Sequence, residues 1–498
     1  MRFWSYAKDV LSGRRSMGKA IWDATRGYRT VRVALMGSKG SGKTVFLTSL
    51  ANHLRDHRPT ELPLGGRIVT WDKYAISGDT LHGLPMFDYA EARGFLSRGE
   101  WPRKTTESSI LALRLLVEDK DGNQETVQLE VVDVPGERIA DFAMKGRSYR
   151  EWCRWMQHES ANSSYSAYLA DVEKIAKSGQ IGDAEIEAVF KAYRDFIGRE
   201  YESFAPCITP SVVKLGIDGE RRGGRSPEEF RAAIDNVPIG FTDDKGVVWQ
   251  FVPLPEKCFV KGSPWSKMLG RCEEAYGKYV RKIVRPVVDW MAGADKLFYL
   301  VDMLSLLESG AKACDSERQY GEAAISALCK KNAGFLKIAM RTFFLPWSFL
   351  LNWRSQINAA YVVVTKADCV WSQANRDNLV MLADALFGRV LRLLDKKRTK
   401  SGILPCAAVC STKERTDGEP GLQGKIDDPD HPEQPPVLMK WKPSDVPSAL
   451  PPSSEEWQQM IDDGKFDYRC AFPWFDEAQI CPPKHINLNL LVEAMLAR

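Results

Sequence analysis

Short apolar runs separated by polar turns recur along the chain and predict the strands of a mainly parallel sheet. The clearest of them lie at 31–36, 296–301, 359–364 and 402–409. A helical spacing of apolar positions follows the first run, over 45–54. Two further runs, 109–117 and 126–132, flank a charged turn that contains Asp-Gly, and they predict a β-hairpin. Strands and helices that alternate in this way are typical of an α/β fold.

The middle of the chain has a different pattern. From 149 to 204, aromatic and charged residues recur at helical spacing without a strand signal. We therefore predict a mainly helical insertion at 149–290 that separates a first sheet portion, 29–148, from a second, 291–498. Residues 415–455 are rich in Pro, Asp, Gly and Ser, and they predict an extended surface loop with one short strand candidate at 436–441.

Two segments combine basic and apolar residues. Residues 1–28 have the pattern of a basic amphipathic helix, and an apolar stretch from Phe343 to Leu351 is flanked by lysines and arginines. Either segment suits an anionic membrane face or a protein partner. The more ordinary interpretations are a helix packed on its own domain and a buried helix pair, and we favour these. Since no apolar run reaches about eighteen residues, we expect no transmembrane helix.

The strongest chemical signal lies between the first predicted strand and the helix that follows it. The stretch reads Gly37-Ser38-Lys39-Gly40-Ser41-Gly42-Lys43-Thr44, which is the glycine-rich turn of a phosphate-binding P-loop. Its glycines let successive N–H groups point at phosphate oxygens, and the helix that begins near Lys43, with Val45 in its first turn, adds a positive dipole end. We expect Lys43 to reach the β- and γ-phosphates and Thr44 to bind Mg²⁺. The sequence therefore predicts a nucleoside-phosphate site.

A second motif ends the predicted hairpin and reads Asp133-Val134-Pro135-Gly136. A carboxylate at the end of an apolar strand is where an outer ligand of Mg²⁺ sits in P-loop hydrolases. The glycine three positions later can donate its backbone N–H to a γ-phosphate. Because this motif follows a complete P-loop by one hairpin, we interpret it as functional.

A third motif follows the apolar run at 359–364 and reads Thr365-Lys366-Ala367-Asp368. The Asp368 carboxylate can accept two hydrogen bonds from guanine, whereas adenine offers no such pair of donors, so this residue favours GTP over ATP. The stem of Lys366 is expected to cover the base. Ser411 and Thr412 follow the next predicted strand, and we expect their loop to present backbone N–H groups to guanine O6.

The order GSKGSGKT, DVPGE and TKAD resembles that of Ras-like GTPases, and the details resemble the YcjX-like family (DUF463) of bacterial P-loop GTPases. Further stretches that carry this resemblance are Trp101-Pro102, Pro253-Leu254-Pro255, Leu300-Val301-Asp302 and Pro482-Pro483. The resemblance implies a Ras-like G domain, a mostly parallel sheet flanked by helices, with a large inserted helical domain. It also implies hydrolysis of GTP to GDP and phosphate with Mg²⁺, in a slow regulatory or stress-related switch.

The resemblance also assigns roles to single residues. The implied catalytic set is Lys43, Thr106, Gly136 and Glu137, and the implied metal ligands are Thr44, Thr106 and Asp133. Thr105 remains an alternative to Thr106 as the switch threonine. Glu137 stands where many GTPases carry a water-orienting glutamine, and its carboxylate adds negative charge beside the γ-phosphate. We therefore expect slow intrinsic hydrolysis.

Composition narrows the possible binding partners and the expected cellular location. The net charge is only +4 and the basic residues are dispersed, which disfavours nucleic-acid binding. Eleven cysteines occur without a CxxC pair, as in a protein of a reducing compartment, and we expect a cytoplasmic protein. We favour a switch that acts on an unknown protein effector. The alternative is a membrane-associated mechanochemical GTPase at the inner membrane face, which uses residues 1–28 and 343–351. The sequence names neither partner nor oligomeric state.

Overall fold

The computed structural model describes most of the chain. The described residues are 26–55, 67–72, 80–103, 108–118, 121–159, 163–176, 181–202, 210–211, 234–235, 238–243, 245–329, 357–396, 399–427, 435–473 and 483–497. Thr105, Thr106, nearly all of the predicted N-terminal helix and the apolar stretch from Phe343 to Leu351 lie outside them, so these predictions stay untested. None of the helices in the described ranges combines the length and the hydropathy that a membrane crossing requires.

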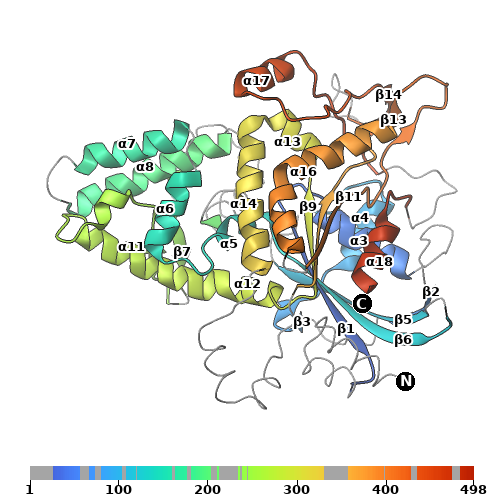
Figure 1. Ribbon diagram of the computed structural model, residues 1–498, viewed down its shortest axis with the longest axis horizontal. Helices are drawn as coiled ribbons and strands as arrows, with labels where there is room; N and C mark the ends of the chain where they lie inside the picture. Colours follow the sequence, from blue (N-terminus) through green and yellow to red (C-terminus); the bar gives the residue numbers. More distant parts are fainter. Residues whose placement is uncertain are drawn as a thin grey trace. The chain divides into compact units, whose positions relative to one another are not determined.

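The chain forms two compact units, and the first is built on a seven-stranded sheet (Figure 1). The strand order is β11-β10-β9-β1-β6-β5-β2. Five neighbouring strands, from β11 to β6, run parallel, whereas β5 is antiparallel to both β6 and β2. The strands span Arg29–Gly37 (β1), Arg67–Asp72 (β2), Ser109–Glu118 (β5), Gln124–Asp133 (β6), Lys296–Val301 (β9), Ala359–Val364 (β10) and Lys400–Pro405 (β11). This mostly parallel sheet, flanked by helices, confirms the predicted fold class.

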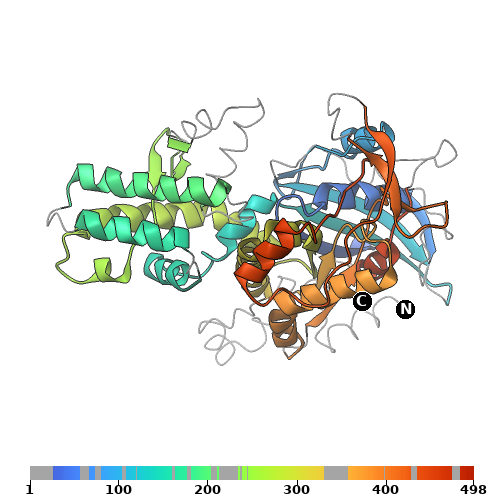
Figure 2. The same cartoon turned by 90° about the horizontal axis from the view of Figure 1, so that it is seen from above.

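Helices cover both faces of the sheet. One apolar cluster joins β1 and β9 to α3 (Lys43–Arg55) and α18 (Leu488–Leu496), and it includes Leu50, Phe298 and Leu491. Because side chains alternate along a strand, Tyr299 points to the other face. There its ring lies 5.3 Å from Phe387 of α16 (Gln373–Asp395). The central strands are therefore buried on both sides, which explains their continuous apolar runs (Figure 1, Figure 2).

Smaller elements complete this unit. They are β3 (Thr80–Leu81), β4 (Leu84–Pro85), α4 (Tyr89–Ser97), α13 (Met303–Ser309), β12 (Lys413–Glu414), β13 (Leu422–Ile426), β14 (Val437–Trp441) and α17 (Ser454–Asp462). The predicted extended loop, 415–455, thus contains an antiparallel β13–β14 pair. The strand β14 lies at the predicted short strand, whereas β13 was not predicted. Its sequence, Leu-Gln-Gly-Lys-Ile, carries a strand-weakening glycine and few apolar positions.

The second unit comprises Gly136–Trp290 and Asp315–Ala327. It is mainly helical, with one short two-stranded sheet, and α7 and α8 lie side by side in it (Figure 1, Figure 2). Its elements are η2 (Gly136–Arg138), α5 (Ile139–Phe142), α6 (Tyr149–Glu159), α7 (Ser163–Ala176), α8 (Asp183–Glu202), β7 (Gly240–Thr242), β8 (Val248–Gln250), η4 (Glu256–Phe259), α11 (Ser266–Tyr279), the π-helix η5 (Val280–Val284), most of α12 (Arg285–Met291) and part of α14 (Ala311–Cys329). That residues 149–290 form a separate inserted domain stays a prediction.

A buried carboxylate lies inside the second unit. Asp141 of α5 is 2% exposed, and it accepts hydrogen bonds from Tyr279 Oη at 2.6 Å and from Ser211 N and Oγ at 2.9 and 2.5 Å. Burial raises the pKa of Asp141, although the bonds from Ser211 and Tyr279 act against the rise. The short helix after the Asp133 motif is therefore tied to the end of α11, where the π-helix begins.

We expect Tyr279→Phe to lower the free energy of unfolding by about 1–3 kcal/mol, because it removes a donor from a buried carboxylate. Chemical unfolding of the full chain, followed by tryptophan fluorescence, measures this loss. The control is Tyr276→Phe. The Tyr276 hydroxyl donates to the main-chain oxygens of Met144 and Arg147, so its removal should cost less. Equal losses in the two variants would contradict a special role for Asp141.

Candidate functional site

The P-loop stretch lies at the carboxyl edge of the parallel sheet. The strand β1 ends at Gly37 and α3 begins at Lys43, so the loop connects a strand to a helix as predicted. On one side β1 pairs with β6, with Leu35 opposite Asp133, and on the other side it pairs with β9, with Gly37 opposite Leu300. Ligands of open α/β sheets bind outside the carboxyl ends of such neighbouring strands.

Three glycines of the loop have backbone conformations that other residues rarely adopt. At Gly37 φ is 151°, and an added Cβ would lie 2.4 Å from Leu300 O, so a side chain cannot fit. Gly40 and Gly42 have φ values of 82° and 81°, in the left-handed region that glycine enters without a steric penalty. The loop geometry therefore requires the glycine pattern that the sequence shows.

The ammonium group of Lys43 closes the loop on itself. It is buried, and it donates to Gly37 O at 2.7 Å and to Ser38 O at 3.1 Å. A main-chain bond from Ser41 to Ser38 (3.2 Å) tightens the turn. Lys39 and Gly40 are exposed at its tip, and Thr44 and Val45, in the first turn of α3, are half-buried. A positive charge and the start of a helix thus face the same turn.

The Asp133 motif divides between the two units. Asp133 is fully buried, ends β6 and belongs to the first unit with the P-loop. Gly136 and Glu137 are buried in η2, at the start of the second unit. The roles predicted for these three residues, and for Thr106, stay predictions.

The Thr365 to Asp368 turn is fixed between two strands. Thr365 N donates to Val301 O, at the end of β9, at 2.9 Å, and Ala367 N donates to Cys406 O, just after β11, at 3.2 Å. Lys366 adopts the left-handed conformation with φ of 58°. The turn is closed by Cys369 N, which donates to Lys366 O at 2.9 Å.

The structure brings Asp368 together with Ser411 and Thr412. Ser411 N and Oγ donate to Asp368 Oδ2 at 2.8 and 3.0 Å, and Thr412 N donates to the same oxygen at 3.3 Å. Burial raises the pKa of Asp368, and these hydrogen bonds lower it in part. The loop that we expected at guanine O6 therefore also orients the carboxylate predicted to select the base.

Asp302 is a site residue to which the sequence analysis gave no role. It follows β9 directly, and its Oδ2 lies 2.5 Å from Lys366 Nζ. The same carboxylate caps α13, since it accepts from Ser305 N at 3.1 Å. Burial would lower the pKa of Lys366, but attraction to Asp302 outweighs it and the pKa is raised. The signal was available in the sequence, because Asp302 ends an apolar run as Asp133 does.

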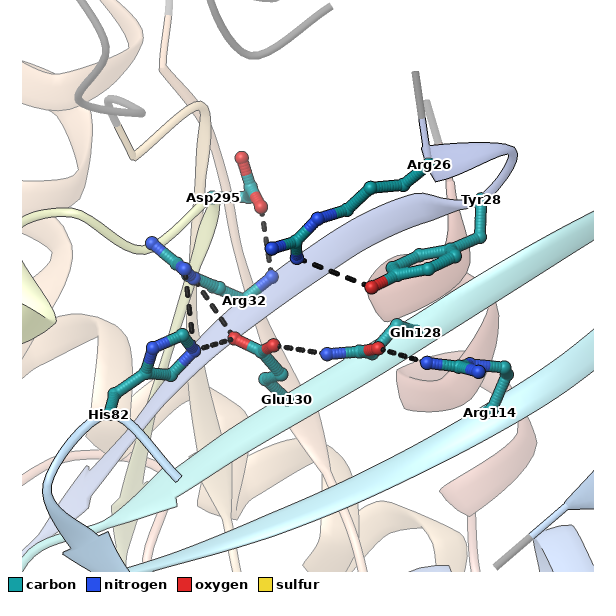
Figure 3. Close-up of polar contacts among 8 residues, drawn as sticks. All are labelled: Arg26, Tyr28, Arg32, His82, Arg114, Gln128, Glu130 and Asp295. Carbon is teal, nitrogen blue, oxygen red and sulfur yellow. Dashed lines mark hydrogen bonds and ion pairs between the residues drawn. The ribbon is translucent and has the colours of Figure 1, made fainter. Parts of the chain in front are cut away.

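A polar network joins side chains of β1, β5 and β6 (Figure 3). Its centre is Glu130 of β6, which is buried and accepts from Arg32 Nε at 3.0 Å, from Gln128 Nε2 at 2.6 Å and pairs with His82 at 3.1 Å. Burial would raise the pKa of Glu130, but the bond with His82 and the charge of Arg32 hold it below its usual value. Because Glu130 lies on the strand that ends in Asp133, the network secures that strand against β1.

Comparison with known proteins agrees with these motifs. The model of a family described as "YcjX-like family, DUF463" matches residues 31–210 and 243–497. A protein of Shewanella oneidensis named "Ras-like GTPase YcjX" is 25% identical over 390 residues, which cover 72% of each chain. An Escherichia coli K12 protein of the same name is 31% identical over 308 residues, 58% of this chain and 62% of its own length.

We expect Asp302→Asn to separate the two tasks of this carboxylate, because asparagine can still cap α13 but carries no charge for Lys366. The loss of a charged hydrogen bond predicts a decrease in unfolding free energy of roughly 1.5–3 kcal/mol. The matched control is Asp88→Asn, since Asp88 caps α4 without an ion pair in the described part of the chain. Urea unfolding of both variants measures the difference, and similar small losses would argue against a strong Asp302–Lys366 pair.

Proposed function

The chain belongs to the YcjX-like family, and from this premise we propose that it is a GTPase that binds GTP and hydrolyses it to GDP and phosphate with Mg²⁺. The observation that carries the proposal is the position of two loops on one sheet. The P-loop follows β1 and the Asp368 turn follows β10, and only β9 separates these strands. A nucleotide that lies across the carboxyl end of β9 has its phosphates at one loop and its base at the other.

The P-loop residues are suited to phosphate. The hydroxyl of Ser41 is buried and has no hydrogen-bond partner among the described residues, although buried polar atoms are usually paired. Lys43 Nζ, close to two carbonyl oxygens of its own loop, would exchange these neutral acceptors for anionic phosphate oxygens, which form stronger bonds. The helix start at Lys43 adds backbone donors.

Mg²⁺ would be held by Thr44 and Asp133. Both offer oxygen, which Mg²⁺ prefers, and this ion is usually bound by one or two side chains together with nucleotide phosphates. In the described ranges no group of three His, Cys, Asp or Glu side chains is placed to hold a metal ion by itself. When bound, the ion neutralises charge that develops on the phosphates.

Base selection would depend on Asp368. Its carboxylate is oriented by Ser411 and Thr412, so little ordering is required when guanine binds. Its burial strengthens the hydrogen bonds that it makes, because the surroundings have a low dielectric constant. Lys366, held by Asp302, would place its aliphatic stem along the base. Adenine would not offer this carboxylate the pair of donors that guanine offers.

Hydrolysis itself would be slow. Glu137 stands in the sequence where many GTPases carry a water-orienting glutamine, but a second negative charge near the γ-phosphate opposes the reaction. We therefore infer a switch in which the nucleotide state changes the segment around Gly136 and so the surface offered to a protein effector. Because the second unit begins at Gly136, this segment links the nucleotide site to the helical part along the chain.

Calorimetry with GDP, a non-hydrolysable GTP analogue and the matching ATP analogue, all with Mg²⁺, tests the proposal. We expect guanine nucleotides to bind and Asp368→Asn to weaken them at least about a hundredfold, since two hydrogen bonds to a charged group, each worth roughly 1.5–3 kcal/mol, are disrupted. The control is Asp395→Asn, at the exposed end of α16.

Phosphate release from GTP tests hydrolysis, and we expect Lys43→Ala to abolish it. Equal binding of the ATP analogue contradicts guanine selection, and no release contradicts the GTPase assignment.

The raised pKa of Asp368 predicts a pH dependence. Guanine needs the ionised carboxylate, so affinity is full above the pKa of the nucleotide-free site and falls as the pH drops through it. Because burial raises this pKa, the fall should begin at a higher pH than for an ordinary aspartate, whose pKa is about 3.9. GDP titrations at decreasing pH measure the change. The residual binding of Asp368→Asn should lack this step, and a step of equal size in the variant would assign it to another group.

A further inference from the structure

The strand β13 packs against the loop that we expect at the base. Gly424, at the centre of this strand, is buried, and an added Cβ there would lie 2.7 Å from Ala471 Cβ, 3.2 Å from Ser411 O and 3.2 Å from Trp441 Cη2. Non-bonded carbon atoms are normally about 3.5–4.0 Å apart. No side chain therefore fits at position 424 unless a neighbouring segment moves.

The reason for a glycine at this position is steric and not conformational. Gly424 does not have a positive φ, so another residue could adopt its backbone conformation. A glycine weakens a strand, because it adds no packing and loses much conformational freedom on folding. Such a glycine often marks a place where another backbone approaches closely. Here that backbone is the carbonyl group of Ser411.

Ser411 connects β13 to the carboxylate of Asp368. The Ser411 N–H donates to Asp368 Oδ2 at 2.8 Å, whereas the Ser411 carbonyl oxygen lies beside Gly424. Directly after Thr412 the chain enters β12, which pairs with β13. The loop that orients the carboxylate is therefore in contact with β13 and continues into the strand that pairs with it.

The turn that carries Asp368 is connected to the same strand by apolar packing. Trp371, three residues after Asp368, packs on an apolar cluster that includes two residues of β13 and Ala471. Ala471 is fully buried, and the residue after it donates its N–H to Lys425 O of β13 at 2.7 Å. Both parts of the expected base site thus depend on the position of β13, the turn through this cluster and the Ser411 loop directly.

We propose that Gly424 is a positioning residue for guanine, because the close packing of β13 on Ser411 fixes the loop that orients the Asp368 carboxylate. This role rests on the proposed function, and it places part of base selection in a strand outside the sequence motifs. A side chain at position 424 displaces Ser411 relative to Asp368. The carboxylate then no longer accepts both hydrogen bonds from the base with good geometry.

Gly424→Ala in the full chain tests this role, with GDP and inosine diphosphate as probes. The base of inosine lacks only the exocyclic amine of guanine, so the ratio of the two affinities measures one hydrogen bond to Asp368. We expect GDP to bind roughly tenfold more weakly, as for one impaired hydrogen bond to a charged group, and the preference for GDP to decrease. Calorimetry with Mg²⁺ measures both affinities. Unchanged binding overturns the proposal, and so does an equal loss for the two nucleotides, which a merely structural role would produce.

Two further variants separate close packing from general destabilisation. Combining Gly424→Ala with Ala471→Gly removes the nearest atom, the Cβ at 2.7 Å, so the strand can move into this space and the preference for GDP should return. Gly418→Ala is the matched control in the turn before β13. Its φ of 83° strains an alanine, but the added Cβ meets no atom within 4 Å, so the preference should stay. A preference that is lost in Gly418→Ala, or that does not return in the double variant, contradicts the role of Gly424.

Hydrogen exchange of the original chain provides a measurement that needs no variant. Because coupling between two sites is reciprocal, a strand that positions the base site must itself be stabilised when guanine binds. GDP should therefore slow amide exchange in β13 more than inosine diphosphate does at equal saturation, and identical protection overturns the proposal. Failure of the original chain to bind GDP contradicts the proposed function instead, so the two failures are distinguishable.

Discussion

Parallel pairing of β6, β1, β9 and β10 is the constraint on which the candidate site depends. It brings the carboxyl ends of four strands to one edge. An aspartate lies at or after the end of three of these strands: Asp133 ends β6, Asp302 follows β9 directly, and Asp368 lies in the turn after β10. Carboxylates so close to the apolar centre of a sheet are costly unless cations or hydrogen-bond donors meet them. Lys366 forms an ion pair with Asp302, and Ser411 and Thr412 donate hydrogen bonds to Asp368.

The sequence was sufficient to predict the fold class and the positions of the motif-bearing loops after β1, β6 and β10, because each motif is contiguous and follows an apolar run. The glycines of the P-loop, for example, can be recognised without knowledge of their neighbours. Contacts between distant segments could not be predicted in this way. The pair of Asp302 and Lys366, for example, depends on the adjacency of β9 and β10 in the sheet.

The second unit follows a different principle of stabilisation. Its interior contains aromatic side chains whose ring centroids lie 5.4–5.6 Å apart, as among Trp152, Phe251 and Tyr276. Tyrosine hydroxyls in such a core must find acceptors, and Asp141 is one of them. The composition of helices in this part of the chain, which is aromatic rather than aliphatic, thus accounts for a buried acid close to the Gly136 segment.

Because Gly37 lies close to Leu300, a substitution at Gly37 affects β9 as well as the P-loop. An added Cβ at position 37 would overlap the main chain of β9, so the strand would have to yield. Two residues beyond Leu300 lies Asp302, which holds Lys366. Under the proposed function, a substitution at Gly37 in the P-loop would therefore also impair discrimination between guanine and adenine. In such a variant the substituted residue would lie beside the phosphates, whereas the affected interaction would be that with the base.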